Sequence, residues 1–160
     1  MRKLYKIQDG ILRYHEAWIH DQQLFEHWGV AGDRGELRHH RLEPGASGTN
    51  PVEKALQTAV HDGFRVLEPD EHSTLVIEYP ISGMGTELDL LKRHKLEDHV
   101  DQLLGWTGLG HCDGGSTGSG TMEVFCLVAD FDIARRVIAD DIAKSGFSGY
   151  SRIYRLEDDA

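Results

Sequence analysis

Hydrophobic and polar residues alternate along the first part of the chain, in short stretches that glycines and acidic residues separate. Apolar and aromatic side chains recur in residues 4–7, 11–18 and 24–28. A period of two is typical of β-strands. The Asp-Arg-Gly sequence at residues 33–35 indicates a turn before a further strand at residues 36–42. The pattern predicts an antiparallel meander.

The spacing changes to that of a helix after a loop at residues 43–50. Asn50 is a suitable N-cap, and Pro51 occupies the first helical position, where proline is favoured. Apolar residues then follow at helical spacing, at Val52, Ala55, Leu56, Ala59 and Val60. Gly63 is expected to end this helix.

Residues 68–73 are polar and acidic with one proline, and they predict a linker. Beyond it, strand, helix, strand, strand, helix and strand are expected at residues 74–79, 87–104, 107–120, 121–128, 130–146 and 150–156. This order is that of the ferredoxin-like βαββαβ fold, an antiparallel sheet with both helices on one face. The apolar side of the first of these helices is expected to comprise Leu88, Leu91, Leu96, Val100, Leu103 and Leu104. We therefore predict an α+β protein, with a β-rich domain at residues 1–70 and a ferredoxin-like domain at residues 73–157.

The chain is acidic, because its 17 Lys and Arg residues face 27 Asp and Glu residues and the formal net charge is −10. This balance argues against a protein that holds nucleic acid by bulk electrostatics. The concentrated basic stretch of the sequence comprises Arg34, Arg38, His39, His40 and Arg41. We therefore expect a protein or small-molecule partner rather than nucleic acid. Any nucleic-acid contact should be local, weak and sensitive to salt.

The first candidate site joins this basic stretch to the aromatic residue before it. Trp28, Arg34, Arg38 and Arg41 are the predicted binding residues, since a cationic face beside an aromatic ring suits a phosphate or a strand end. Arg38 and His40 should point to one face of their strand, and His39 and Arg41 to the other. The alternative is a packed tryptophan at a bent hairpin, in which the glycines allow close backbone approach.

Residues 3–67 resemble the WGR domain, a small module of poly(ADP-ribose) polymerases and many bacterial proteins. The resemblance rests on Trp28-Gly29, on Gly32 and Gly35, and on a helix with Ala55 and Ala59 that ends at Gly63-Phe64. It implies a small sheet with one helix, and DNA-end binding in members that carry the motif arginine. Val30 stands at that position in this chain.

The second candidate site is the glycine-rich stretch at residues 108–120. Its backbone amides suit an anion-binding nest, and its chemistry-bearing residues are His111, Cys112, Asp113 and Ser116. The stretch is neither a Walker loop nor a dinucleotide fingerprint, because no Gly-Lys-Ser/Thr and no helix follows. The alternative is a long hairpin or bulged edge strand.

The sequence is compatible with three functions. The leading one is a non-enzymatic binding or regulatory module that uses the Trp/Arg face and the glycine-rich hairpin. The alternatives are a DNA-end-binding accessory protein of the WGR type and a small metal- or thiol-dependent enzyme using His111, Cys112 and Asp113. Consecutive strand residues alternate between faces, and no paired zinc ligands occur at short spacing. We therefore assign no catalytic residue, no metal ligand and no cofactor.

The expected setting is the cytoplasm of a bacterium. No run of apolar residues reaches the roughly 18–20 that a membrane helix needs, and the first residues lack the apolar middle of a signal peptide. Cys112 and Cys126, the two cysteines, are expected to be reduced thiols, and the ten histidines to lie mostly at the surface. By analogy with other ferredoxin-like sheets, a homodimer is also open.

Overall fold

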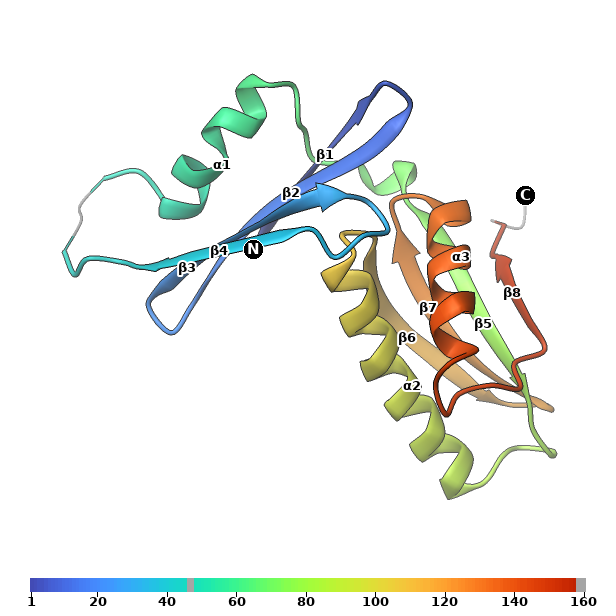
Figure 1. Cartoon of the computed structure of the whole chain (residues 1–160). Helices are drawn as coiled ribbons and strands as arrows, with labels where there is room; N and C mark the ends of the chain where they lie inside the picture. The colour runs from blue at the N-terminus through green and yellow to red at the C-terminus, as the bar shows by residue number, and fades with distance from the viewer. Residues whose placement is uncertain (46–47, 158–160) are drawn as a thin grey trace. The chain divides into compact units, whose positions relative to one another are not determined.

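The computed structural model of the chain describes residues 1–45 and 48–157. The chain divides into two compact units, Met1–Glu68 and Pro69–Ala160. Each unit contains its own four-stranded sheet, and all strand pairs of both sheets are antiparallel (Figure 1). The predicted α+β class is therefore confirmed.

The sheet of the first unit is a meander in which neighbours in sequence are neighbours in space. Its strands are β1 (Arg2–Gln8), β2 (Ile11–His20), β3 (Gln23–Val30) and β4 (Glu36–Arg41), paired in that order. The turn residues Asp9, Gly10, Asp21 and Gln22 all have positive φ. Two central residues with positive φ form a turn whose twist matches that of the flanking strands. The two tight hairpins of the meander follow from this geometry.

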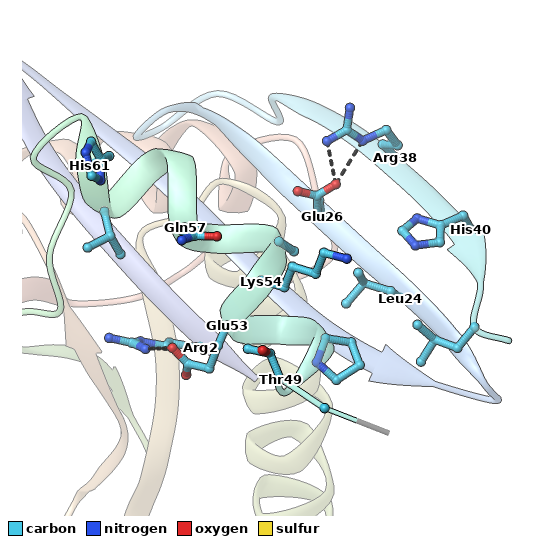
Figure 2. A pocket seen from close by; sticks show the side chains of 15 residues that line it. Arg2, Leu24, Glu26, Arg38, His40, Thr49, Glu53, Lys54, Gln57 and His61 are labelled. Carbon is cyan, nitrogen blue, oxygen red and sulfur yellow. Dashed lines mark hydrogen bonds and ion pairs between the residues drawn. The ribbon is translucent and has the colours of Figure 1, made fainter. Parts of the chain in front are cut away.

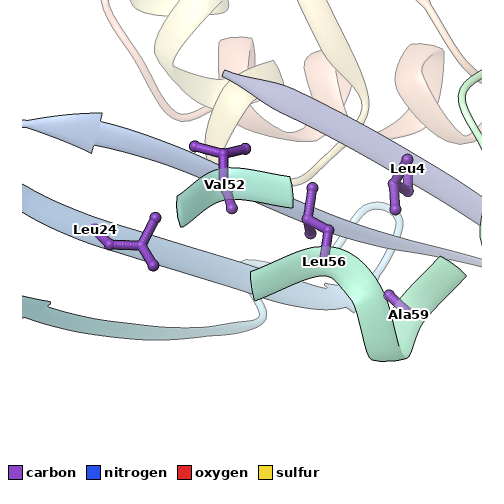
Figure 3. Packing of buried hydrophobic residues seen from close by; sticks show 6 residues of the cluster. Leu4, Leu24, Val52, Leu56 and Ala59 are labelled. Atoms are coloured by element: carbon purple, nitrogen blue, oxygen red, sulfur yellow. The ribbon is translucent and has the colours of Figure 1, made fainter. Parts of the chain in front are cut away.

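One helix, α1 (Pro51–His61), covers a face of this sheet. The Asn50 side chain accepts a hydrogen bond from the Val52 amide at 3.0 Å, and Pro51 opens the helix, as the sequence predicts. Figure 3 shows how the helix packs on the strands. The buried cluster consists of Leu4, Ala17, Leu24, Val52, Leu56 and Ala59. Burial of these apolar side chains holds the helix to the sheet.

The second unit has the predicted element order. Its elements are β5 (Ser73–Pro80), α2 (Glu87–Trp106), β6 (Gly110–Gly118), β7 (Thr121–Val128), α3 (Phe131–Ile142) and β8 (Arg152–Arg155). A short 3-10 helix, η1 (Pro69–Glu71), precedes them. The strand order is β6-β7-β5-β8, and both helices lie on one face of the sheet (Figure 1). Asp130 caps α3 by accepting from the Ile133 amide at 2.9 Å.

The apolar side of α2 differs from the prediction. Leu96, Val100 and Leu104 are buried, but Leu88 is 76% exposed and Leu91 is 49% exposed. A helix turns by about 100° per residue, so Leu91 lies about 140° round the axis from Leu96. The predicted stripe was therefore too wide to be covered by one sheet. Within the described ranges, no helix has both the length and the apolar character needed to cross a membrane.

Candidate functional site

A groove of about 970 Å³ lies on the first unit, between α1 and the edge strand β4 (Figure 2). Strand residues line one side of it, and helix residues line the other. Its charged and ionisable lining residues include Arg2, Glu26, Arg38, His40, Glu53 and Lys54. Apolar side chains, among them Leu24, Leu42 and Ala55, lie between them.

Strand register brings the strand residues of the groove together. Glu26 of β3 is paired with Arg38 of β4, and Leu24 is paired with His40. Alternate residues of a strand point to the same face, so all four lie on the face that α1 covers. On the helix, Lys54 extends towards these strands (Figure 2). The groove is thus assembled from residues that are far apart in the sequence.

Two of the cations in the groove have carboxylate partners. Arg38 donates to Glu26 Oε2 from Nε at 2.9 Å and from Nη2 at 2.5 Å, and Arg2 forms an ion pair with Glu53. The side chains of Lys54 and His40 make no hydrogen bond or ion pair with any other described residue. The groove therefore presents a lysine ammonium and an imidazole, both available to a ligand, beside apolar surface.

Trp28 and Arg38, two residues of the predicted Trp/Arg face, do meet. The guanidinium carbon of Arg38 lies 5.4 Å from the centroid of the Trp28 ring, which is within cation–π range. On its other side, Trp28 packs against the His15 ring at a centroid distance of 5.7 Å. Burial lowers the pKa of His15, which favours a neutral imidazole against the tryptophan.

Arg34 and Arg41 do not lie with Trp28 and Arg38 on one face, and for Arg41 this agrees with the alternation expected from the sequence. Arg41 is paired with Gln23 and alternates with His40, so it points to the opposite face of β4 from Arg38. Arg34 lies in the loop before β4, where its backbone carbonyl accepts a hydrogen bond from His27 Nε2 at 2.6 Å. The predicted set of four is therefore divided between two faces and a loop.

The opposite face of this sheet carries a buried polar network that the sequence reasoning missed. His27, only 1% exposed, places Nδ1 2.7 Å from Glu16 Oε1 and Nε2 3.1 Å from the Tyr14 hydroxyl. The Lys3 ammonium lies 3.0 Å from the other oxygen of Glu16. Burial, and then the charge of Glu16, raise the pKa of Tyr14. The expectation of a surface histidine was wrong for His27, since alternation alone does not tell which face is covered.

At Gly35, the backbone of the loop between β3 and β4 lies close to Trp28 and to Tyr14 of this network. A Cβ at this position would lie 2.3 Å from the Trp28 carbonyl oxygen and 2.3 Å from the Tyr14 hydroxyl, and the φ of Gly35 is +66°. The glycine thus lets the loop between β3 and β4 fold back over Tyr14. That loop carries the carbonyl of Asp33, which accepts a hydrogen bond from the Tyr14 hydroxyl at 3.1 Å.

In the second unit, the glycine-rich stretch forms strand β6, and its candidate residues do not converge. Cys112 is paired with the buried Cys126, and its amide donates to Asp101 Oδ1 of α2 at 2.9 Å. His111 and Asp113 are exposed neighbours on either side of it. Neighbouring strand residues face opposite ways, and the pairing is interrupted between Cys112 and Gly115.

Ser116 and Gly115 of β6 contact residues of β7 and α2. The Ser116 hydroxyl donates to Glu123 Oε2 of β7 at 2.7 Å. A Cβ at Gly115 would lie 2.3 Å from the Glu123 carbonyl oxygen and 2.9 Å from Glu97 Oε1 of α2. Glycine at this position therefore lets β6 pass between its partner strand and α2, which supports the hairpin interpretation of residues 108–120.

The pKa of Cys112 is shifted in the opposite direction to that of an activated thiol. Its sulfur lies 3.4 Å from that of Cys126, and this hydrogen bond, followed by burial, raises the pKa of Cys112. Nucleophilic cysteines need a lowered pKa, because the thiolate is the reacting species. In the part of the chain that the structure describes, no three His, Cys, Asp or Glu side chains gather in a way that could hold a metal ion.

Comparisons of the chain with protein-family models, with curated proteins and with solved structures find no match.

Proposed function

We propose that the first unit is a non-enzymatic binding module that takes an anionic ligand in the groove between β4 and α1. The observation that carries this proposal is the pair of side chains without a partner among the described residues, Lys54 and His40, beside apolar groove surface. An exposed cation next to apolar surface suits a ligand that brings both negative charge and apolar area.

The contacts of the groove support binding rather than catalysis. Covalent catalysis needs a nucleophile within hydrogen-bond reach of a base that a third group orients. Among the described residues that line the groove, the side-chain ion pairs are those of Arg38 with Glu26 and of Arg2 with Glu53. Such pairs fix the shape and charge of a surface.

The net charge of −10 favours a protein or small-molecule ligand. A nucleic-acid backbone is held by many cations that each neutralise a phosphate. Two of the three lysine and arginine residues that line the groove already have carboxylate partners within it. An anionic ligand with a few, well-placed charges suits this surface better than a polyanion.

The proposal can be tested by NMR titration of the full chain, labelled with nitrogen-15. The probes are a short glutamate-rich peptide, inorganic phosphate and a nicked DNA duplex. We expect the peptide to shift the amide signals of groove residues such as Lys54 and His40. The double variant Lys54→Ala/His40→Ala should weaken binding about tenfold or more, as loss of a charged hydrogen bond does.

Lys95→Ala is the matched control, because Lys95 is an exposed lysine of α2 that does not line the groove. It should bind the peptide as the unaltered chain does. Unchanged peptide affinity in the double variant, or no binding of any probe, would overturn the proposal.

The likeness to WGR domains supplies a second candidate, contact with a DNA end through Trp28. The observation in its favour is that Arg38 brings a guanidinium to the Trp28 ring although Val30 stands at the motif position. A gel shift with nicked and blunt duplexes at low salt should then show a complex that Trp28→Ala/Arg38→Ala removes. The absence of a shift at micromolar protein would dispose of this candidate.

A further inference from the structure

Strand β4 is the edge of its sheet beside the groove. The strand order β1-β2-β3-β4 gives β4 a strand neighbour on one side, and all six of its residues are exposed. The other edge of the sheet is treated differently, since Tyr5 of β1 exchanges two backbone hydrogen bonds with Arg65, at 2.7 and 3.0 Å. An open edge strand is a template for another extended segment.

The pairing with β3 shows which backbone groups of β4 point outwards. Just beyond β4, the Leu42 amide donates to the Gln22 carbonyl at 2.8 Å, so these two residues form a hydrogen-bonded pair. Bonded and non-bonded pairs alternate along an antiparallel ladder. The backbone N–H and C=O groups of His40 and Arg38 are therefore hydrogen-bonded to β3. The N–H and C=O groups directed away from the sheet are those of Leu37, His39 and Arg41.

We propose that the ligand of the groove is an acidic, extended polypeptide segment that adds to β4 as a further strand. This inference rests on the proposed function and names the ligand class of the same site. Backbone hydrogen bonds to Leu37, His39 and Arg41 hold the segment, and its alternate side chains face the groove. Strand addition beside a helix-lined groove combines main-chain affinity with side-chain selection.

Charge complementarity selects an acidic segment. On the groove face, an added strand lies beside Arg38 and His40, within the groove that Lys54 also lines. On the other face, it lies beside His39 and Arg41, which alternation places there. Both faces of the added strand therefore meet positive or protonatable side chains. Acidic residues at the alternate positions that face the groove come near Arg38, His40 and Lys54, whereas a basic segment is repelled.

The first experiment measures amide hydrogen exchange of the full chain with and without a peptide of alternating Glu and Thr. Strand addition should slow exchange at Leu37, His39 and Arg41 by about tenfold or more, since each amide gains a partner. Exchange at Arg38 and His40, whose amides already bond to β3, should change less. Binding without protection at Leu37, His39 and Arg41 would overturn strand addition and leave the proposed groove function standing.

The second experiment uses two versions of the same peptide, one N-methylated at the Glu amides and one at the Thr amides. A strand offers one set of alternate amides to its neighbour and points the other set away. One methylated peptide should therefore lose at least tenfold in affinity, and the other should bind as before. Equal affinity of the two, high or low, contradicts strand addition.

The third experiment compares His39→Pro with His39→Ala. Proline removes the outward N–H without removing a bond to β3, which edge strands tolerate. Alanine removes the same imidazole, with its stacking on Phe25 and its hydrogen bond to Gln23, but keeps the N–H. Both variants lose the imidazole, but only His39→Pro also loses the N–H, so peptide binding should be at least tenfold weaker in His39→Pro than in His39→Ala. Equal binding by the two folded variants contradicts the proposal, and the exchange pattern decides it if His39→Pro does not fold.

If neither the acidic peptide nor inorganic phosphate binds, both the proposed function and this inference fail, whereas binding of phosphate without the peptide overturns this inference alone. If β4 carries basic residues merely to keep copies of the chain from pairing edge to edge, the peptide does not protect the three outward amides. The experiments therefore distinguish a wrong ligand class from the absence of a binding site.

Discussion

The sulfur atoms of Cys112 and Cys126 lie 3.4 Å apart on directly paired residues of β6 and β7. Both are free thiols. Two electrons and two protons must leave the pair for a disulfide to form. A diazene oxidant such as diamide accepts both, so we expect it to join the two sulfurs within one chain. Mass spectrometry should show a loss of about 2 Da that dithiothreitol reverses. Two alkylatable thiols after oxidant treatment and denaturation would contradict this expectation.

The same contact makes Cys112 a slow nucleophile. The hydrogen bond with Cys126 is the largest cause of its raised pKa, followed by burial. We expect iodoacetamide to alkylate Cys112 more slowly than a free cysteine at neutral pH, because less thiolate is present. Cys126→Ala removes the largest cause and should speed the reaction. Equal rates in the variant and the unaltered chain would show that access, rather than the thiol pair, limits alkylation.

Gly35→Ala should destabilise the first unit by about 3 kcal/mol, because it combines a left-handed backbone with overpacking. Its added Cβ would meet both the Trp28 carbonyl oxygen and the Tyr14 hydroxyl at 2.3 Å. Gly10→Ala is the matched control, since Gly10 also has positive φ but has no atom within 4 Å of a Cβ. It should cost about 1 kcal/mol. Urea unfolding, followed through the amide signals of the first unit, measures both, and equal losses would refute the close approach.

Glu16→Gln should cost about 3 kcal/mol, because breaking a buried ion pair leaves the partner charge uncompensated. The side chain of Glu16 is 5% exposed, and it contacts both Lys3 and His27. Glu53→Gln breaks the exposed pair with Arg2 and should cost less than about 1 kcal/mol. The same urea experiment compares the two. A smaller loss for Glu16→Gln than for Glu53→Gln would show that the buried network contributes little.

The second unit should lose stability at alkaline pH through Tyr79. Burial, and then the nearby Tyr150, raise its pKa to about 12, and its hydroxyl donates to the Phe147 carbonyl. A raised pKa stabilises the folded state below the unfolded value of about 10, and this contribution is lost as the pH rises towards 12. Melting temperatures between pH 8 and 11.5 should fall less steeply in Tyr79→Phe. Parallel curves would contradict the assignment to Tyr79.

Most secondary structure could be predicted because its causes are local. Asn50 and Pro51 start α1 through a side-chain cap and a fixed φ, and both effects need only neighbouring residues. The meander and the βαββαβ order follow from periods of two and 3.6 in the apolar residues. Leu91 shows the limit of this reasoning, because it was predicted to lie on the apolar side of α2 and is exposed. The pattern does not tell how wide a stripe of the helix the sheet covers.

The candidate site could be predicted only in part, because it depends on register and on the position of α1. Trp28 and Arg38 were identified from a local cationic stretch, and they do meet. Lys54 was missed because it is an ordinary helix lysine until the helix is packed beside β4. Arg41 was included because it is near in sequence, although strand alternation turns it to the other face.

The sequence by itself determined the elements, their order and their antiparallel sheets, because periodicity, caps and turns act over a few residues. The tertiary structure alone decided that Glu16 and His27 are buried together, that Cys112 meets Cys126, and that Lys54 and His40 share a groove. These contacts join residues from different elements, and strand register together with helix packing selects them. The sequence shows the chemical type of each side chain, but it does not show which other side chain lies against it in the fold.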